Sequence, residues 1–353
     1  MNEVRIFIPN DINFLVDKKE YFLLVRPFLS SRGWIKKGEM FDEWDLDEKK
    51  IVLVKDIKYA TLLLIPYTIN FFFENKMEKF LSNYNDLCNQ YGILGYAYIS
   101  GDHPTKYKEF DKLVYFRMGG FRSKLSSKNI GFPAALTDQY PKIFGTNKIL
   151  TNDKKARPVV GFCGLATDKR SVILKQRLKY LLDFILGIKS KPYTKGFQPI
   201  FLSSIERYKI LMQFEKSKFI ETNFIFRDKY RAGAKNSKQL ENTTKEYYSN
   251  IRESDYVFCL RGYGNFSIRL YETLMMGRIP ILLNTDCILP FPDLIDWKEH
   301  LIIVEWHERN SISEIVNNFH SSITDQNFKD VQINNRLLWL EKLKPKWILE
   351  NLI

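Results

Sequence analysis

Residues 255–284 read DYVFCLRGYGNFSIRLYETLMMGRIPILLN, and this stretch decides the fold that we expect for the chain. Its first six residues are mostly apolar, which is typical of a buried strand, and the Arg-Gly-Tyr-Gly segment that follows lets the backbone turn tightly. Apolar residues then recur at helical spacing from Phe266 to Leu274, and Ile279–Leu283 is a second buried strand. The stretch therefore predicts a strand, glycine turn, helix and strand, a unit whose helix N-terminus typically presents amides to an anionic ligand.

The polar residues of this unit favour a phosphate-bearing ligand. Arg261 stands where the strand ends, so its guanidinium can hold a phosphate through two parallel hydrogen bonds. Asn265 or Ser267 can cap the helix. Arg269 and Glu272 share a helix face, which fits either a surface ion pair or a ligand site. The candidate ligand-binding residues of the unit are Arg261, Gly262, Gly264, Asn265, Ser267, Arg269 and Glu272.

Three motifs stand in order here: RGYGNFSIRLYE from Arg261, GRIP from Gly277 and LPF from Leu289. They resemble the Arg-Gly turn, Ser-x-Arg-x-x-Glu helix, Gly-x-Ile-Pro strand and Leu-Pro segment of exostosin-like glycosyltransferases. The resemblance implies an α/β fold of the GT-B type, with two Rossmann-like domains facing each other across a cleft. It also implies sugar transfer from a nucleotide donor, with Glu272 holding the donor ribose and Arg261 the diphosphate.

The length of 353 residues suggests two domains. We expect an acceptor-side Rossmann-like domain at 1–150 and a nucleotide-sugar-binding Rossmann-like domain at 151–335. The polar, basic segment 146–157 is the expected linker. By the same resemblance, the C-terminal helical segment 336–353 is expected to pack back on the first domain.

A second candidate phosphate site follows the strand expected at 158–164, before the helix expected at 169–186. Gly164, Lys169 and Arg170 lie at this turn. The family pattern has an arginine at the start of this helix, and Arg170 fits it. Further along, the polar stretch from 228 to 244 is expected to be a loop, and residues 245–252 are expected to form a short helix.

Composition narrows the choice of partners and location. The formal net charge of +13 invites a polyanionic partner or an anionic membrane surface, but the lysines are spread along the chain, which favours a solvated surface over nucleic-acid binding. The four cysteines show no paired spacing and are expected to be reduced. The N-terminus lacks the pattern of a signal peptide, and no apolar run reaches the length of a membrane helix. We therefore expect a cytoplasmic protein, with peripheral contact on the inner face of a membrane as a further expectation.

The catalytic base and the metal requirement are the least determined features. Asp102 and His103 follow a predicted strand of the first domain, so either could take a proton from the acceptor, although Asp102 could equally bond its own turn. Glu109 and Asp111 are the next candidates. The pair in Asp45-Leu46-Asp47 has metal-binding spacing but lies in a charged run, which favours a solvated face, so no metal site is predicted.

The sequence is thus interpreted as a glycosyltransferase that needs no cofactor besides its nucleotide-sugar donor. We expect a UDP-sugar donor, a glycan or lipid-linked saccharide acceptor, an inverting and metal-independent reaction, and a role in surface polysaccharide synthesis. The alternative is a nucleotide- or nucleic-acid-binding Rossmann-type protein that transfers no sugar. A nicotinamide enzyme is disfavoured, because neither opening strand is followed by a complete G-x-G-x-x-G motif.

Overall fold

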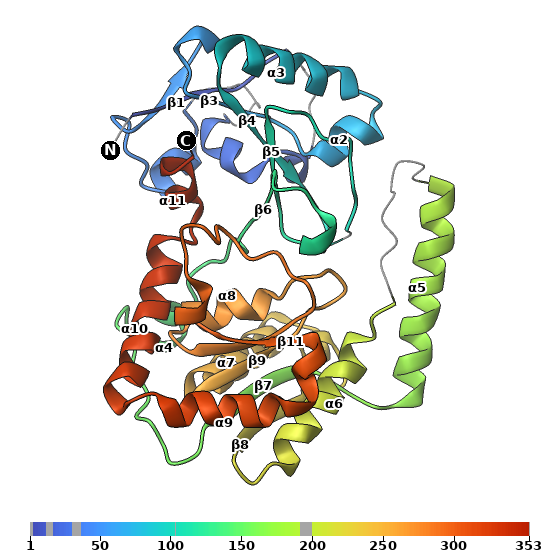
Figure 1. Ribbon diagram of the computed structural model, residues 1–353, viewed down its shortest axis with the longest axis vertical. Coiled ribbons are helices and arrows are strands. Elements are labelled where there is room, and N and C mark those ends of the chain that lie inside the picture. The colour runs from blue at the N-terminus through green and yellow to red at the C-terminus, as the bar shows by residue number, and fades with distance from the viewer. Residues whose placement is uncertain (1–2, 12–16, 30–36, 103, 191–199, 353) are drawn as a thin grey trace.

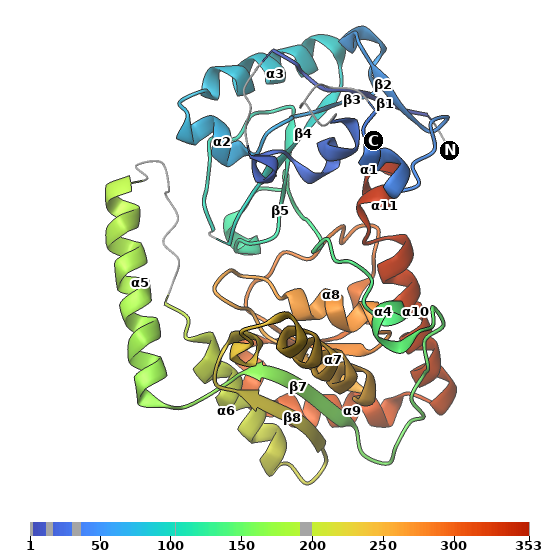
Figure 2. The same cartoon turned by 180° about the vertical axis from the view of Figure 1, so that it is seen from behind.

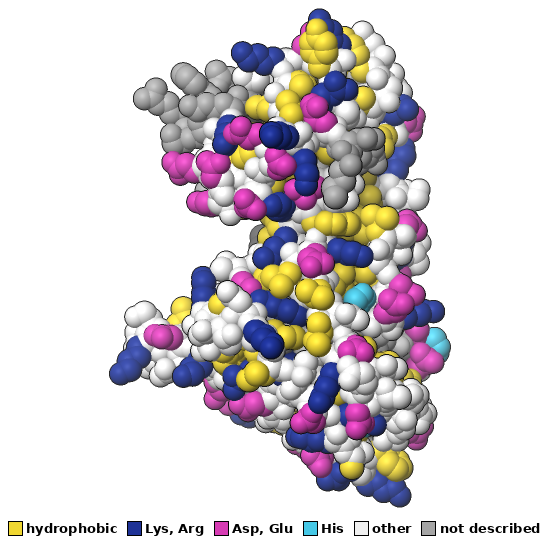
Figure 3. All heavy atoms as spheres, turned by 90° about the vertical axis from the view of Figure 1, so that its left-hand side faces the viewer, with side chains coloured by type: hydrophobic (Ala, Val, Ile, Leu, Met, Phe, Trp, Pro, Cys, Tyr) yellow, Lys and Arg dark blue, Asp and Glu magenta, His cyan; other side chains and the backbone are white. Residues whose placement is uncertain are grey.

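The computed structural model describes residues 3–11, 17–29, 37–102, 104–190 and 200–352. It shows two α/β domains stacked along the long axis of the molecule, each built on one parallel sheet with helices on both faces (Figure 1, and from behind in Figure 2). The space-filling view shows two lobes joined by a waist, with a hollow between them on one side (Figure 3). The predicted fold class, two Rossmann-like domains facing each other, is confirmed.

The first domain is a twisted parallel sheet in the order β2-β1-β3-β4-β5-β6. Its strands are β1 (Val4–Phe7), β2 (Ile51–Val54), β3 (Leu62–Leu64), β4 (Leu94–Ile99), β5 (Leu113–Arg117) and β6 (Asn129–Gly131). Its helices are α1 (Glu39–Glu43), α2 (Ile69–Glu74) and α3 (Glu78–Tyr91). Helices α2 and α3 bury Phe72, Leu81 and Tyr84 against one face of the sheet. A short 3₁₀ helix, Leu23–Phe28, packs on the other face.

The second domain contains the predicted strand, turn, helix and strand at its centre. Its strands are β7 (Val159–Leu165), β8 (Glu221–Arg227), β9 (Tyr256–Cys259), β10 (Ile279–Asn284) and β11 (Ile302–Glu305), in the order β11-β10-β9-β7-β8. Its helices are α4 (Tyr140–Phe144), α5 (Arg170–Ser190), α6 (Ser203–Lys216), α7 (Ser237–Glu253), α8 (Ile268–Met275), α9 (Ile312–Ser322) and α10 (Asp325–Glu341). Nearly every side chain of β9 and β10 is buried, as expected for central strands of a parallel sheet. Gly277 ends α8 in the left-handed region, at φ 62°.

The chain passes between the domains twice. The first passage lies between β6 and α4, because Tyr140 of α4 is already buried in the core of the second domain. The expected linker at 146–157 instead runs along that domain, where Asn152 exchanges hydrogen bonds with Gln332. The chain returns after α10, and α11 (Pro345–Glu350) buries Ile348 and Leu349 in the core of the first domain. Pro345 is the first residue of α11, where its missing N–H costs no hydrogen bond.

Two segments differ from the sequence-based expectation. The polar stretch expected to be a loop up to residue 244 contains the first half of α7, residues 237–244. The second half coincides with the short helix expected at 245–252 and buries Tyr248 and Ile251. Helix α6, between α5 and β8, was not predicted at all. It buries Ile210, Leu211 and Phe214 against the sheet. Over the described ranges, no helix combines the length and the apolar character needed to cross a membrane.

Candidate active site

The polar residues of the predicted unit lie at the carboxyl edge of the second sheet, where open α/β sheets bind ligands. Strand β9 ends at Cys259, and the chain then turns through Arg261–Gly264 before α8 begins. Gly262 leaves space in this turn, because a Cβ placed there would meet nothing closer than Nη2 of Arg207, at 3.9 Å. Gly264 leaves none, since a Cβ there would lie 2.8 Å from the carbonyl oxygen of Asp102 in the first domain. The turn is therefore open on one side and closed by the first domain on the other.

Three guanidinium groups gather at this turn, and Arg207 is the one that the sequence did not reveal. Arg207, on α6, donates to the carbonyl oxygens of Leu260 and Arg261, at 3.3 and 3.0 Å. Arg261 is 2% exposed and donates to the carbonyl oxygen of Tyr263, at 2.8 Å. Arg269, on α8, donates to the carbonyl oxygen of Cys163, at 2.9 Å. These three residues are called the arginine cluster below.

The arginine cluster retains unused hydrogen-bonding capacity. The Nε atom of each of the three guanidiniums is buried and has no hydrogen-bond partner among the described residues. The three guanidiniums donate to neutral main-chain oxygens, and Arg269 also interacts with the side chain of Tyr247. Burial, followed by the positive charge of Arg269, lowers the pKa of Arg207 to about 9. Burial likewise lowers the pKa of Arg261. Clustered positive charge in a partly desolvated site of this kind suits a polyanion such as a diphosphate.

Glu272 is the acidic residue that faces this cluster from α8. Its carboxylate accepts hydrogen bonds from two adjacent tyrosines of α7: from Tyr247 at 2.5 Å and from Tyr248 at 3.2 Å. Burial raises the pKa of Glu272, and these hydrogen bonds and the charge of Arg269 oppose that rise. The tyrosines fix the carboxylate in place, so it can accept a further hydrogen bond from a ligand hydroxyl without reorganising.

Asn265 joins the two domains, whereas the prediction gave it a ligand-binding or capping role. Its amide nitrogen donates to the carbonyl oxygens of Gly120, Thr285 and Asp286, at 2.9, 2.9 and 2.8 Å. Its amide oxygen accepts from the Thr285 hydroxyl, at 2.6 Å. Ser267 occupies the N-cap position of α8 but makes no side-chain capping hydrogen bond.

The first domain supplies one of the two predicted base candidates to this turn. Asp102 lies after β4, its side chain is exposed, and its main chain packs against Gly264 and Gly119. His103 lies outside the described residues. Glu109 accepts hydrogen bonds from Ser126 and Asn129, at 2.6 and 2.7 Å, which gives it a structural role within its own domain.

The second predicted phosphate site is only partly assembled. Gly164 lies against the guanidinium of Arg269, because a Cβ at this position would be 2.8 Å from Nη2 of Arg269. Its φ is 157°. Lys169 forms an exposed ion pair with Asp228 at 2.8 Å, and Arg170 is exposed at the start of α5. Arg207, rather than Arg170, is thus the arginine that reaches the glycine turn.

The described residues contain no group of three histidine, cysteine, aspartate or glutamate side chains that could hold a metal ion. In the Asp45-Leu46-Asp47 segment, Asp45 pairs with Lys346 of α11 at 2.9 Å, and its side chain is 97% exposed. Asp47 accepts from the backbone N–H of Lys49, at 2.9 Å. Both aspartates are exposed to solvent, in agreement with the interpretation of this charged segment as a solvated face.

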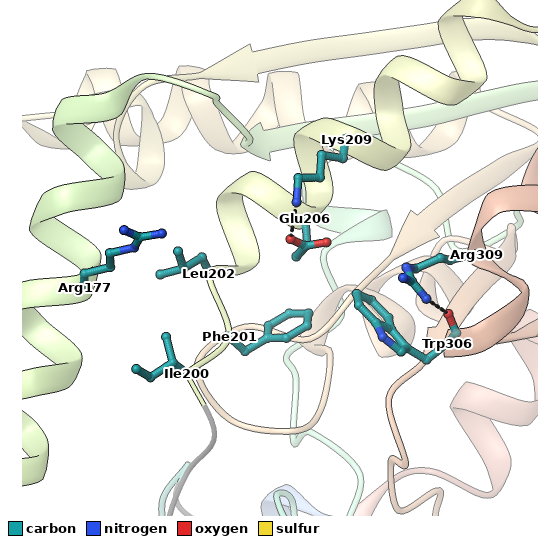
Figure 4. Close-up of a pocket in the computed structure, with 8 residues that line it drawn as sticks. All are labelled: Arg177, Ile200, Phe201, Leu202, Glu206, Lys209, Trp306 and Arg309. Atoms are coloured by element: carbon teal, nitrogen blue, oxygen red, sulfur yellow. Dashed lines mark hydrogen bonds and ion pairs between the residues drawn. The ribbon is translucent and has the colours of Figure 1, made fainter.

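A cavity of about 660 Å³ lies between α5, α6 and the segment that follows β11, and Figure 4 shows the residues that line it. Its lining residues are Arg177, Ile200, Phe201, Leu202, Glu206, Lys209, Trp306 and Arg309. Phe201 connects the cavity to the turn, since its ring lies 4.9 Å from the guanidinium carbon of Arg261 and packs edge-on against Trp306. Figure 4 shows both rings on the same side of the Glu206–Lys209 ion pair. The cavity therefore offers aromatic and cationic groups next to the anion site.

Arg207, Tyr247 and Tyr248 are the site residues that sequence reasoning missed. A signal for Arg207 exists: Ser204, Arg207, Leu211 and Phe214 recur at helical spacing, so the arginine falls on the buried stripe of an otherwise apolar helix face. Both tyrosines lie in the segment 245–252 that was expected to be helical, but no spacing in the sequence connects them with Glu272.

The fold and the arginine cluster define a two-domain α/β protein with a candidate polyanion site between a glycine turn and a helix N-terminus. Residues 205–319, about a third of the chain, match the family model described as the Exostosin GT47 domain. The matched segment begins in α6, two residues before Arg207, and includes the glycine turn, α8 and β10. The predicted resemblance to exostosin-like glycosyltransferases is confirmed over this segment.

Known relatives align with short parts of the chain. A probable glycosyltransferase of Arabidopsis thaliana is 30% identical over 90 residues, which are 26% of this chain and 18% of that protein. A probable glucuronosyltransferase of Oryza sativa subsp. japonica is 32% identical over 92 residues, 26% of this chain and 20% of that protein. The chain thus spans about a fifth of the length of these relatives. Among solved structures, TarM is similar with a TM-score of 0.34 and 11% identity, over 82% of this chain and 54% of TarM.

Proposed function

We propose that this protein is a glycosyltransferase that takes a sugar from a nucleoside-diphosphate donor and transfers it to a saccharide acceptor. The observation that carries the proposal is the arginine cluster. Three guanidiniums whose buried Nε atoms lack partners among the described residues surround a glycine turn with space beside Gly262. The match to the Exostosin GT47 domain covers the same residues.

In the proposed reaction, the acceptor hydroxyl attacks the anomeric carbon of the donor sugar. A new carbon–oxygen bond forms, the bond between that carbon and the diphosphate oxygen breaks, and the hydroxyl proton passes to a base. The leaving diphosphate gains negative charge, which Arg207, Arg261 and Arg269 would neutralise without a metal ion. Glu272, fixed by its two tyrosines, would accept a hydrogen bond from the donor ribose. Asp102 is the proposed base, since its main chain lies against the glycine turn.

We propose a UDP-sugar as donor, a glycan or lipid-linked saccharide as acceptor, an inverting reaction, and a role in surface polysaccharide synthesis in the cytoplasm. The aromatic rings beside Arg261 support a ligand that carries a planar base or a sugar ring next to its phosphates.

Calorimetric titration with UDP, GDP, ADP and inorganic pyrophosphate tests the donor site directly. We expect pyrophosphate to bind and one nucleoside diphosphate to bind more tightly. Incubation with the matching radiolabelled nucleotide sugars and a saccharide mixture then tests transfer. Binding without transfer would support the alternative of a nucleotide-binding protein, and failure of all four ligands to bind would refute the donor site.

A further inference from the structure

Helix α5 has one face against the protein and one apolar face in solvent. Its partly buried side chains are Val172, Ile173, Gln176 and Tyr180. Its exposed apolar side chains are Leu174, Leu178, Leu181, Leu182 and Ile185, with exposed fractions of 69, 54, 53, 49 and 41%. At 3.6 residues per turn, the exposed set forms one continuous stripe about 100° wide, opposite the partly buried set.

The inner face of α5 is anchored, so the apolar stripe cannot simply turn inward. The Tyr180 hydroxyl donates to the carbonyl oxygen of Phe201, at 2.7 Å. The Gln176 side chain accepts from the Ser204 hydroxyl, at 3.0 Å. The Tyr180 ring also stacks on Tyr263 of the glycine turn, with 5.1 Å between ring centroids. Figures 1 and 2 show α5 standing at the side of the molecule, apart from the two sheets.

Cations border the stripe on both sides. Lys175 and Arg177 are exposed, and their positions on the helix lie on either side of Leu174 and Leu178. The segment from Arg170 to Ile185 contains four lysines and arginines and one acidic residue, Asp183. An apolar stripe with basic flanks is the pattern of a helix that lies in the interface of an anionic bilayer.

We propose that the outer face of α5, formed by the five exposed apolar residues with Lys175 and Arg177, binds the surface of a membrane that contains anionic lipids. The apolar stripe enters the boundary between headgroups and acyl chains, and the two flanking cations contact lipid phosphates. A bilayer fits better than an acidic protein, because the stripe runs straight along the helix with cations on both edges. The net charge of +13 adds long-range attraction to the same surface.

This inference stands apart from the proposed sugar transfer. Membrane binding would nevertheless affect sugar transfer, because the inner face of α5 contacts Tyr263 of the glycine turn. Binding through the outer face would hold the glycine turn near the membrane surface, where a lipid-linked acceptor would present its saccharide.

Co-sedimentation with vesicles tests the proposal on the full chain. We expect binding to vesicles of phosphatidylcholine mixed with phosphatidylglycerol, and at least tenfold weaker binding to vesicles of phosphatidylcholine alone. The double variant Leu178→Gln/Leu181→Gln and the double variant Lys175→Glu/Arg177→Glu should each reduce binding at least tenfold. Glutamine retains helix propensity, so circular dichroism should be unchanged.

The matched control is Leu150→Gln/Leu294→Gln, which removes two exposed leucines of 63 and 58% exposure elsewhere on the surface. It should bind the anionic vesicles as the unaltered protein does. Equal binding by the α5 variants and the control would overturn the proposal, as would absence of vesicle binding by the unaltered protein. Self-association in solution that Leu178→Gln/Leu181→Gln abolishes, without vesicle binding, would assign the face to a second copy of the chain instead. Pyrophosphate titration of Leu178→Gln/Leu181→Gln, whose side chains do not line the cavity to which Arg177 contributes, separates this outcome from failure of the donor site.

Discussion

Arg207→Met should weaken diphosphate binding strongly while leaving the fold as stable as before or more so. Methionine keeps the length of the side chain and removes the charge. A hydrogen bond between a charged group and its partner contributes about 1.5–3 kcal/mol, so loss of the Arg207 contact should weaken pyrophosphate and UDP binding about tenfold to a hundredfold. The fold loses two hydrogen bonds to the carbonyl oxygens of Leu260 and Arg261 but no longer holds a buried charge without a carboxylate partner.

Arg278 provides the matched comparison, because it is a buried arginine with a structural role. It donates to the carbonyl oxygens of Arg252, Gly277 and Leu150 and to the side chains of Gln332 and Asn152, all within 2.8–3.1 Å. Losing five such bonds should lower the free energy of unfolding by about 3 kcal/mol or more. Arg278→Met is therefore expected to lower the melting temperature well below that of Arg207→Met.

The assay is calorimetric titration of each variant with pyrophosphate and UDP, combined with thermal denaturation without ligand. Arg207→Met should lose affinity and keep its melting temperature. If it instead kept the dissociation constants and lost stability to the same degree as Arg278→Met, Arg207 would be a structural residue and the arginine cluster would not be an anion site.

Three further outcomes test the rest of the site. Burial raises the pKa of Glu272 above the ordinary value of 4.5, so the carboxylate becomes protonated on mild acidification. The affinity for UDP should then fall relative to the affinity for pyrophosphate, which lacks a ribose. In Glu272→Gln, the ratio of the two affinities should not change with pH. Asp102→Asn should lower turnover about a hundredfold with unchanged UDP affinity, and normal turnover would exclude Asp102 as the base. Transfer should persist in excess EDTA, and loss of activity that returns on adding a divalent ion would direct attention to acidic residues outside the arginine cluster.

The central unit of the second domain could be predicted because each of its parts has a local cause. The strands are continuous apolar runs, Gly277 ends α8 with a positive φ, and the helix spacing of Arg269 and Glu272 is visible in the sequence. Nothing beyond residue spacing was needed to place Arg261 at the end of a strand.

The rest of the site depends on contacts between segments far apart in the chain, which spacing does not reveal. Arg207 reaches the turn from α6, 54 residues before Arg261, and a long helix, α5, separates α6 from β7. Arg170 matched the family pattern by its order in the chain, but α5 carries it to the surface. The two tyrosines that fix Glu272 lie in the part of α7 that was expected to be helical, but their contact with a residue 24 and 25 positions later cannot be predicted from spacing.

The glycine turn serves both the domain contact and the proposed chemistry. Asn265 ties the turn to Gly120 of the first domain, and Gly264 lets the main chain of Asp102 approach so closely that any larger residue would collide with it. Arg261, three residues earlier, belongs to the arginine cluster. The position of the proposed base relative to the leaving diphosphate is therefore set by main-chain packing across this turn. Gly264→Ala should accordingly impair transfer by moving Asp102, even though residue 264 itself contributes no functional group to the reaction.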